Sequence, residues 1–115
     1  MNKEADKKNT GVTSVEHIEV MPPVDIMEDN DSYIMFFEVP GTNASAVKAE
    51  VENNILTVEC ASTLQRNKRP VLFKRIFRLS KAVDVSKITA TAADGVLKLH
   101  LPKADHVKPF RVPVA

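Results

Sequence analysis

The fold of this 115-residue chain is decided by residues 88–102, Ile-Thr-Ala-Thr-Ala-Ala-Asp-Gly-Val-Leu-Lys-Leu-His-Leu-Pro. Apolar side chains alternate with threonine over Ile88–Ala92, and leucine occupies every second position of Val96–Leu101. A period of two is typical of a strand with one buried face. Asp94-Gly95 favours the positive φ angles of a tight hairpin turn, and Pro102 ends the second strand because it has no N–H to donate. This stretch therefore predicts a β-hairpin.

Five further segments upstream have strand-like patterns and are separated by turn residues. They are Val24–Glu28, Tyr33–Val39, Val47–Glu52, Ile55–Cys60 and Phe73–Leu79. Tyr33–Val39 is almost continuously apolar, which predicts a strand covered on both faces. Asn53-Asn54 predicts a second tight hairpin. Because no apolar period of 3.6 residues lasts longer than about two turns, we expect an all-β protein with an immunoglobulin-like antiparallel β-sandwich.

Length and composition limit the organisation to one domain. Residues 1–22 are polar and poorly periodic, so they are predicted to be a flexible N-terminal arm that Pro22-Pro23 closes. Residues 23–103 hold the sandwich, and residues 104–115 form a C-terminal tail. The chain is 43% hydrophobic but has no tryptophan, so its core depends on Val, Ile, Leu and five Phe.

Charge and targeting patterns narrow the classes of partner. Sixteen basic and fifteen acidic residues give a net charge of +1. We therefore expect no nucleic-acid or membrane partner, and little charge repulsion against self-association. No signal-peptide pattern and no apolar run of about 20 residues is visible, and a single cysteine cannot form an internal disulfide. These observations predict a cytoplasmic protein.

Residues with catalytic potential are few. Cys60 shares a face with Leu56 and Val58, which favours a buried packing residue over a nucleophile. Three histidines, His17, His100 and His106, lack ligand spacing. The basic cluster around Arg66–Arg78 is interpreted as a solvated strand edge. We therefore expect no enzyme activity, no cofactor and no metal.

The tail carries a candidate docking motif, Val112-Pro113-Val114. Proline pre-sets an extended backbone, so both valines project from one side at little entropic cost. Pro109 and Phe110 also suit docking. The alternative is a frayed tail with incidental valines. The predicted receptor is a groove between two strands, lined by the small or branched residues Val47, Ala49, Val51, Ile88 and Ala90.

Arg75 lies in the middle of the apolar face that Phe73, Phe77 and Leu79 define. A buried guanidinium without a partner is costly, so a carboxylate or carbonyl partner is expected. The alternative is an arginine that reaches solvent at the sheet edge.

The order of these segments resembles the small heat shock protein family, the Hsp20 proteins with an α-crystallin domain. The resemblance rests on Val39-Pro40-Gly41, on Val47–Val58, on Phe73–Leu79, on Ile88–Leu97 and on Leu99–Lys103. It implies an ATP-independent holdase chaperone that binds partly unfolded client proteins. It also implies a homo-oligomer, or a hetero-oligomer with another small heat shock protein, in which Arg75 pairs across a dimer interface.

Three departures from the family pattern modify that expectation. Ser80 follows Leu79 where the family usually has proline, which we expect to loosen a turn. The N-terminal arm is short, and Ala61–Leu72 provides only 12 residues where bacterial-type members carry a longer swapped loop. A 12-residue loop reaches about 20 Å out and back. We therefore expect a dimer paired through the Arg69–Leu79 edge or a weak dimer, and a small or heterotypic assembly.

Two other functions remain open from the sequence. One is a p23-like co-chaperone adaptor that binds a single folded partner. The other is an accessory paralogue that co-assembles with a longer-armed relative and has little activity alone.

Overall fold

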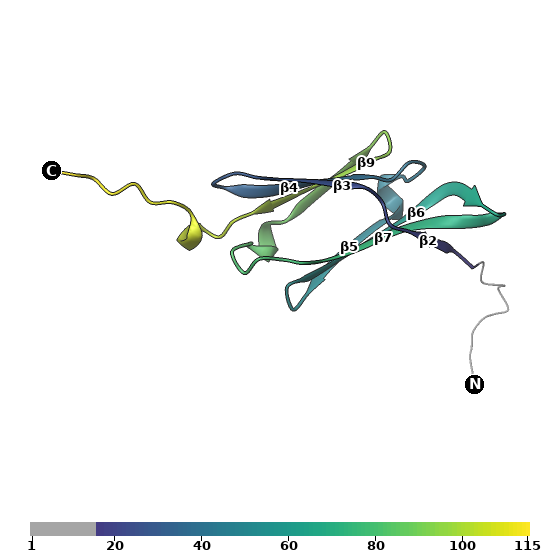
Figure 1. Cartoon of the computed structure of the whole chain (residues 1–115), viewed down its shortest axis with the longest axis horizontal. Helices are drawn as coiled ribbons and strands as arrows, with labels where there is room; N and C mark the ends of the chain where they lie inside the picture. Colours follow the sequence, from purple (N-terminus) through teal and green to yellow (C-terminus); the bar gives the residue numbers. More distant parts are fainter. Residues whose placement is uncertain (1–15) are drawn as a thin grey trace.

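The computed structural model describes residues 16–115, which form two four-stranded sheets packed face to face (Figure 1). One sheet has the order β3 (Val24–Glu28), β4 (Ser32–Glu38), β9 (Val96–Pro102), β8 (Thr89–Ala93). The other has the order β2 (Ile18–Val20), β7 (Arg69–Arg78), β6 (Ile55–Arg66), β5 (Val47–Glu52). Short 3₁₀ turns lie at η2 (Ala44–Ala46), η3 (Val85–Lys87) and η4 (Asp105–Val107). The predicted all-β sandwich is confirmed.

The core lies between the sheets and follows the period-two pattern of the sequence. Its members are Met35, Phe37, Val39, Leu56, Val58, Cys60, Val71, Phe73, Val83, Leu97, Leu99 and Leu101. Phe37 meets Phe77 edge to face, with ring centroids 5.8 Å apart. The prediction that β4 is covered on both faces is wrong: Ile34 and Phe36 are only half-buried. They point away from the other sheet, and the Lys98 ammonium lies 5.8 Å from the Phe36 ring centroid.

The hairpin turns place asparagine, aspartate and glycine at positive φ. Asn53-Asn54 has φ angles of 52° and 62°, and Asp94-Gly95 has 54° and 76°. Both predicted turns are confirmed. A further turn at Asn67-Lys68 has φ angles of 54° and 62°. The residue pattern does not predict this turn, because lysine rarely adopts a positive φ.

The connection predicted over Ala61–Leu72 is mostly a paired hairpin arm. β6 continues to Arg66 and β7 begins at Arg69, with a register shift between Ala61 and Gln65. The shifted segment is fixed on the Pro40-Gly41 turn, because the Ser62 hydroxyl donates to the Pro40 carbonyl at 2.7 Å. The Thr63 N–H donates to the Gly41 carbonyl at 2.9 Å. The arm thus pairs its backbone groups within the chain, and the mode of dimerisation stays a prediction.

Strand β2 corrects the prediction that residues 1–22 are flexible throughout. Ile18–Val20 pairs in parallel with Val71–Phe73, and Val20 packs against the core. The reason is that β7 offers a strand edge that this short apolar segment can cover. Residues 1–15 of the predicted arm lie outside the described residues.

The strand order leaves two open sides on the sandwich. β5 and β8 are the terminal strands on one side, while β3 and the β2–β7 pair border the other. The β5/β8 side positions the candidate site.

Candidate groove and tail

A trough runs between β5 and β8. Its wider lobe, about 290 Å³, is lined by Ala49, Val51, Leu56, Val85, Ile88, Thr89, Ala90 and Leu99. Its narrower lobe, about 220 Å³, is lined by Ala44, Val47, Ala49, Ala90, Thr91, Ala92 and Leu97. Because Ala49 and Ala90 line both lobes, the lobes join into one groove. The structure brings the five predicted groove residues together here, and their docking role stays a prediction.

The groove is hollow because alanines form its walls where larger side chains would close it. Leu56 and Leu99 form its floor, and both belong to the buried core. The period of two in β6 and β9 could have identified these floor residues.

Val85 forms one end of the wide lobe and was not predicted. It sits in η3, where the Asp84 carboxylate accepts from the Ser86 N–H at 3.1 Å and from the Ser86 hydroxyl at 2.6 Å. These hydrogen bonds lower the pKa of Asp84. The Asp84 N–H donates to the Pro102 carbonyl at 2.8 Å, which ties η3 to the end of β9. A three-residue turn carries no periodicity that could have revealed Val85.

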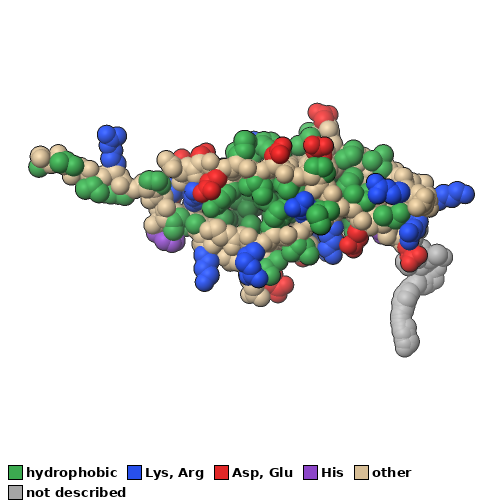
Figure 2. Space-filling model, in the orientation of Figure 1, with side chains coloured by type: hydrophobic (Ala, Val, Ile, Leu, Met, Phe, Trp, Pro, Cys, Tyr) green, Lys and Arg blue, Asp and Glu red, His purple; other side chains and the backbone are tan. Residues whose placement is uncertain are grey.

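The tail extends away from the sandwich beyond η4 (Figure 1). Apolar side chains follow one another along it (Figure 2). The exposed fractions are 82% for Phe110, 70% for Val112 and 93% for Val114. The predicted docking motif is therefore presented to solvent at a distance from the body of its own chain.

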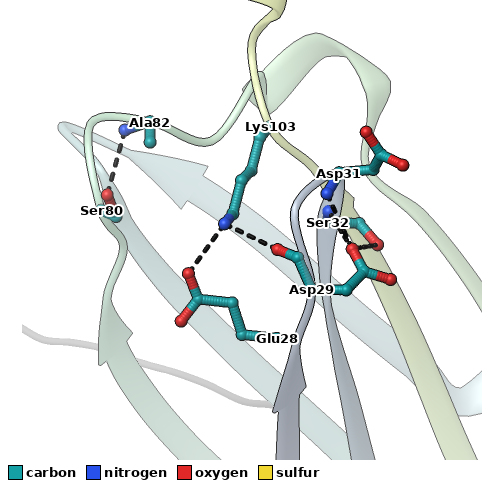
Figure 3. A network of polar contacts seen from close by, with 7 residues as sticks. All are labelled: Glu28, Asp29, Asp31, Ser32, Ser80, Ala82 and Lys103. Carbon is teal, nitrogen blue, oxygen red and sulfur yellow. Dashed lines mark hydrogen bonds and ion pairs between the residues drawn. The ribbon is translucent and has the colours of Figure 1, made fainter. Parts of the chain in front are cut away.

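The base of the tail is held by Lys103 (Figure 3). Its ammonium donates to Glu28 Oε2 and to the Asp29 carbonyl, both at 2.7 Å. The hydrogen bond from the Lys103 ammonium to the Glu28 carboxylate lowers the pKa of Glu28 and raises the pKa of Lys103. The Ala104 N–H donates to the Ala82 carbonyl at 2.7 Å. These contacts join the tail to β3 and to the turn before η3.

The turn before η3, which Ser80 was predicted to loosen, is closed by two hydrogen bonds, and its stiffness relative to a proline turn stays a prediction. The Ser80 hydroxyl accepts from the Ala82 N–H at 3.1 Å (Figure 3). The Ser80 carbonyl accepts from the Val83 N–H, also at 3.1 Å. Serine thus closes with its own side chain a turn that proline would have stiffened.

Arg75 has a carbonyl partner within the chain. Its Nη1 donates to the carbonyl of the buried Pro22 at 3.0 Å, and its guanidinium carbon lies 4.9 Å from the Phe77 ring centroid. The expectation of a carboxylate or carbonyl partner is confirmed. Pairing of Arg75 across a dimer stays a prediction.

The remaining reactive groups are placed as follows. Cys60 is fully buried, and burial raises the pKa of its thiol to about 11, so it is protonated near neutral pH. Within residues 16–115, no group of three or more His, Cys, Asp or Glu side chains could hold a metal ion. No helix in that range is long and apolar enough to cross a membrane.

Taken together, the fold is a β-sandwich of two packed sheets, with an apolar groove between the terminal strands β5 and β8 and an exposed apolar tail. The sequence model of the Hsp20/alpha crystallin family matches residues 25–115. This chain belongs to the Hsp20/alpha crystallin family, as its motifs predicted.

Individual relatives agree with this assignment. The chain is 35% identical over 100 residues to the 18 kDa antigen 2 of Mycobacterium avium, covering 80% of this chain and 72% of that one. It is 30% identical over 102 residues to the 18 kDa heat shock protein of Streptomyces albus G, covering 80% and 71%. A small heat-shock protein of Xylella fastidiosa has the same fold, with a TM-score of 0.65 and 23% identity over 84% of this chain and 97% of that one. Family membership supports a chaperone role in general, and such chaperones are generally not enzymes.

Proposed function

We propose that this protein is an ATP-independent holdase that binds partly unfolded proteins and slows their aggregation. One observation carries the proposal: the same chain combines an apolar groove between two terminal strands with an exposed apolar tail. Partly unfolded clients expose apolar side chains and unpaired strand edges. An extended client segment can add to a strand edge while its alternate side chains fill the groove.

The tail is the natural competitor for that groove. In this proposal, Val112-Pro113-Val114 of one subunit docks between β5 and β8 of another subunit, over Val47, Ala49, Val51, Ile88 and Ala90. Release of the tail then uncovers surface for clients. The Xylella fastidiosa relative is described as having a distinct high order structure, which supports assembly into an oligomer of this chain or with another small heat shock protein. Nucleic acid and membrane are not among the proposed partners.

Arg75 and the β7 edge belong to the dimer contact in this proposal. β2 covers β7 over Val71–Phe73. Among residues 16–115 no other strand pairs with that edge of β7, so residues 74–78 offer an edge on which a second subunit can pair.

Holdase activity is tested by mixing the protein with several heat-denaturing proteins and following light scattering. We expect suppressed scattering near stoichiometric ratios. If no client is protected, the p23-like adaptor or the accessory paralogue is the better assignment, and the holdase proposal fails.

Tail docking is tested by the double variant Val112→Ala/Val114→Ala, with Val107→Ala as a matched control outside the motif. We expect the double variant to form smaller particles by multi-angle light scattering, while the control keeps the mass of the parent protein. An unchanged mass of the double variant contradicts docking.

A further inference from the structure

We infer that the docking unit is the five-residue segment Phe110–Val114, which binds in one direction only, antiparallel to β5. Phe110 is a third anchor that fills the wide lobe of the groove, and Arg111 pairs with Glu50. The occupant is the tail of a second copy of this chain. The inference rests on the proposed tail docking, because it concerns the same groove and adds its length, direction and specificity.

Spacing is the first argument. In an extended chain, Phe110, Val112 and Val114 point to one side and Arg111 to the other, and the segment spans about 13 Å. β5 presents Val47, Ala49 and Val51 at the same spacing along the groove. Three side chains of the tail therefore match three positions of the groove, and two anchors would leave one lobe unfilled.

Size selects the direction. The wide lobe, about 290 Å³, lies at the Val51 end of β5, and the narrow lobe, about 220 Å³, lies at the Val47 end. Phenylalanine is larger than valine, so the better filling places Phe110 at Val51 and Val114 at Val47. The tail then runs opposite to β5.

Charge selects the same direction independently. With Phe110 opposite Val51 and Val114 opposite Val47, Arg111 stands opposite Glu50 on the solvent face of the pair. With the tail reversed, Arg111 stands opposite Lys48. Lys48 and Glu50 are both exposed, with Nζ and Oε2 3.9 Å apart. Opposite charges across two strands are stabilising and like charges are destabilising, so the reversed tail is disfavoured.

The second copy is favoured over the chain's own tail by the way the tail leaves the sandwich. Lys103 and Ala104 are fixed by contacts to Glu28, Asp29 and Ala82. From there the tail runs outward, away from the two sheets (Figure 1). Its three anchors are thus presented toward a neighbouring molecule.

Anchoring is measured by fluorescence anisotropy with a labelled peptide of residues 109–115. The receptor is the full-length Val112→Ala/Val114→Ala variant, whose own tail competes weakly. We expect the Phe110→Ala peptide to bind at least tenfold more weakly, which corresponds to about 1.4 kcal/mol. We expect a similar loss for the composition-matched peptide with Phe110→Val and Val114→Phe. If the parent and Phe110→Ala peptides bind equally well, Phe110 is not a third anchor, although the tail still docks in the groove. If the parent peptide itself does not bind, the proposed docking fails as well.

The proposed pairing of Arg111 with Glu50 is tested in the same binding assay by reversing the two charges. The Arg111→Glu peptide should bind several-fold more weakly to the receptor, and Glu50→Lys in the receptor should restore its binding. The matched control is Lys48→Glu in the receptor, which should not restore binding. Restoration by Lys48→Glu in place of Glu50→Lys overturns the assigned direction.

Direction is measured by disulfide trapping between separate copies, one with a tail cysteine and one with a groove cysteine. The buried Cys60 does not compete. We expect Pro109→Cys to trap Val85→Cys, and Ala115→Cys to trap Ala44→Cys. The exchanged pairs, 109 with 44 and 115 with 85, would overturn the direction. If a disulfide forms only when both cysteines are in one chain, the groove binds the chain's own tail, and the inference that a second copy occupies it is wrong.

Discussion

The two open sides of the sandwich, the β5/β8 side and the β3/β7 side, differ in how far their strand edges are covered. On the β5/β8 side the terminal strands carry small residues toward the gap, and a continuous apolar groove remains. On the β3/β7 side the chain adds β2 over Val71–Phe73, and Arg75 ties β7 to the buried Pro22 that connects β2 with β3. A hollow of about 260 Å³ there has Tyr33 and Phe77 among its walls, in place of alanines.

The two sides therefore deal with their exposed strand edges in different ways. We call the β3/β7 side the protected side and the β5/β8 side, where the tail is proposed to dock, the recognition side. An exposed strand edge invites pairing with other chains, so natural proteins cover it or charge it. β2 covers part of one edge, at Val71–Phe73 of β7, with residues of the chain itself. On the other side, exposed Lys48, Glu50 and Glu52 line the solvent face of β5 while its inner face stays apolar. An edge of that kind discourages indiscriminate pairing and still accepts a segment of matching charge and spacing.

The largest effect is expected at Leu99, which is both groove floor and core. Leu99→Ala should lower the free energy of unfolding by about 2–5 kcal/mol, through lost transfer energy and a cavity. Chemical denaturation measures the change. Leu64→Ala, at an exposed leucine of the hairpin arm, is the matched control and should cost less than about 0.5 kcal/mol. Equal losses in the two variants would show that the groove floor is not part of the core.

The protected side is tested at Arg75. Arg75→Ala removes the hydrogen bond to the Pro22 carbonyl and should lower the free energy of unfolding by about 1–3 kcal/mol. It should also accelerate hydrogen exchange of the amides in β2 and in Val71–Phe73, because the β2 connection loosens. Arg78→Ala, at an exposed arginine of the same strand, is the control. If both variants exchange alike, Arg75 does not hold β2 in place.

The recognition side is tested by filling the groove. Ala49→Phe places a ring where both lobes meet and should weaken binding of the 109–115 peptide more than tenfold, about 1.4 kcal/mol. Because Ala49 is exposed, the free energy of unfolding should change by less than about 0.5 kcal/mol. Ala93→Phe, at an exposed alanine outside the groove lining, should leave peptide binding unchanged. Unimpaired binding to Ala49→Phe would move the docking site elsewhere.

The two sides also differ in how far the sequence predicts them. Three of the groove residues follow from alternation, because Val47, Ala49 and Val51 share one face of a strand whose register Asn53-Asn54 fixes. Strand β2 is three residues long, too short to show a period, and it exists only because β7 offers an edge.

The partner of Arg75 and the pairing of the hairpin arm also could not be predicted from local sequence patterns. The partner of Arg75 lies 53 positions away in the chain, and nothing in the local pattern identifies a main-chain carbonyl. Beyond Ala61 most residues of β6 are exposed, and the buried one, Ser62, is polar, so the pairing of the arm leaves no period of buried apolar residues. Local periodicity therefore predicts which residues pack in the core. Contacts that cover a distant strand edge, or that pair a single partly buried charge such as Arg75, depend on the assembled fold.

The smallest effect is expected at the Glu28–Lys103 pair, which joins the base of the tail to β3 on the protected side. The pKa of Glu28 lies below its ordinary value of 4.5 because Lys103 donates to the carboxylate. Its contribution to stability is therefore complete above pH 4.5 and is lost as the pH falls through the lowered folded-state pKa. Glu28→Gln should flatten part of the decline in urea midpoint between neutral and acid pH. Asp29, Asp84 and Asp105, whose pKa values are also lowered by hydrogen bonds, contribute to the decline that remains.

The control for this pair is Glu52→Gln, an exposed carboxylate at the end of β5 on the recognition side. If the protected side alone anchors the tail, only Glu28→Gln should also broaden the range of tail orientations, measured as increased backbone mobility of residues 104–108 by NMR relaxation. Because Glu28 is solvent-exposed, its change in stability should be small and should shrink further at high salt. Equal pH profiles and equal tail mobility in both variants would show that the backbone contacts of Lys103 and Ala104, and not the ion pair, set the course of the tail.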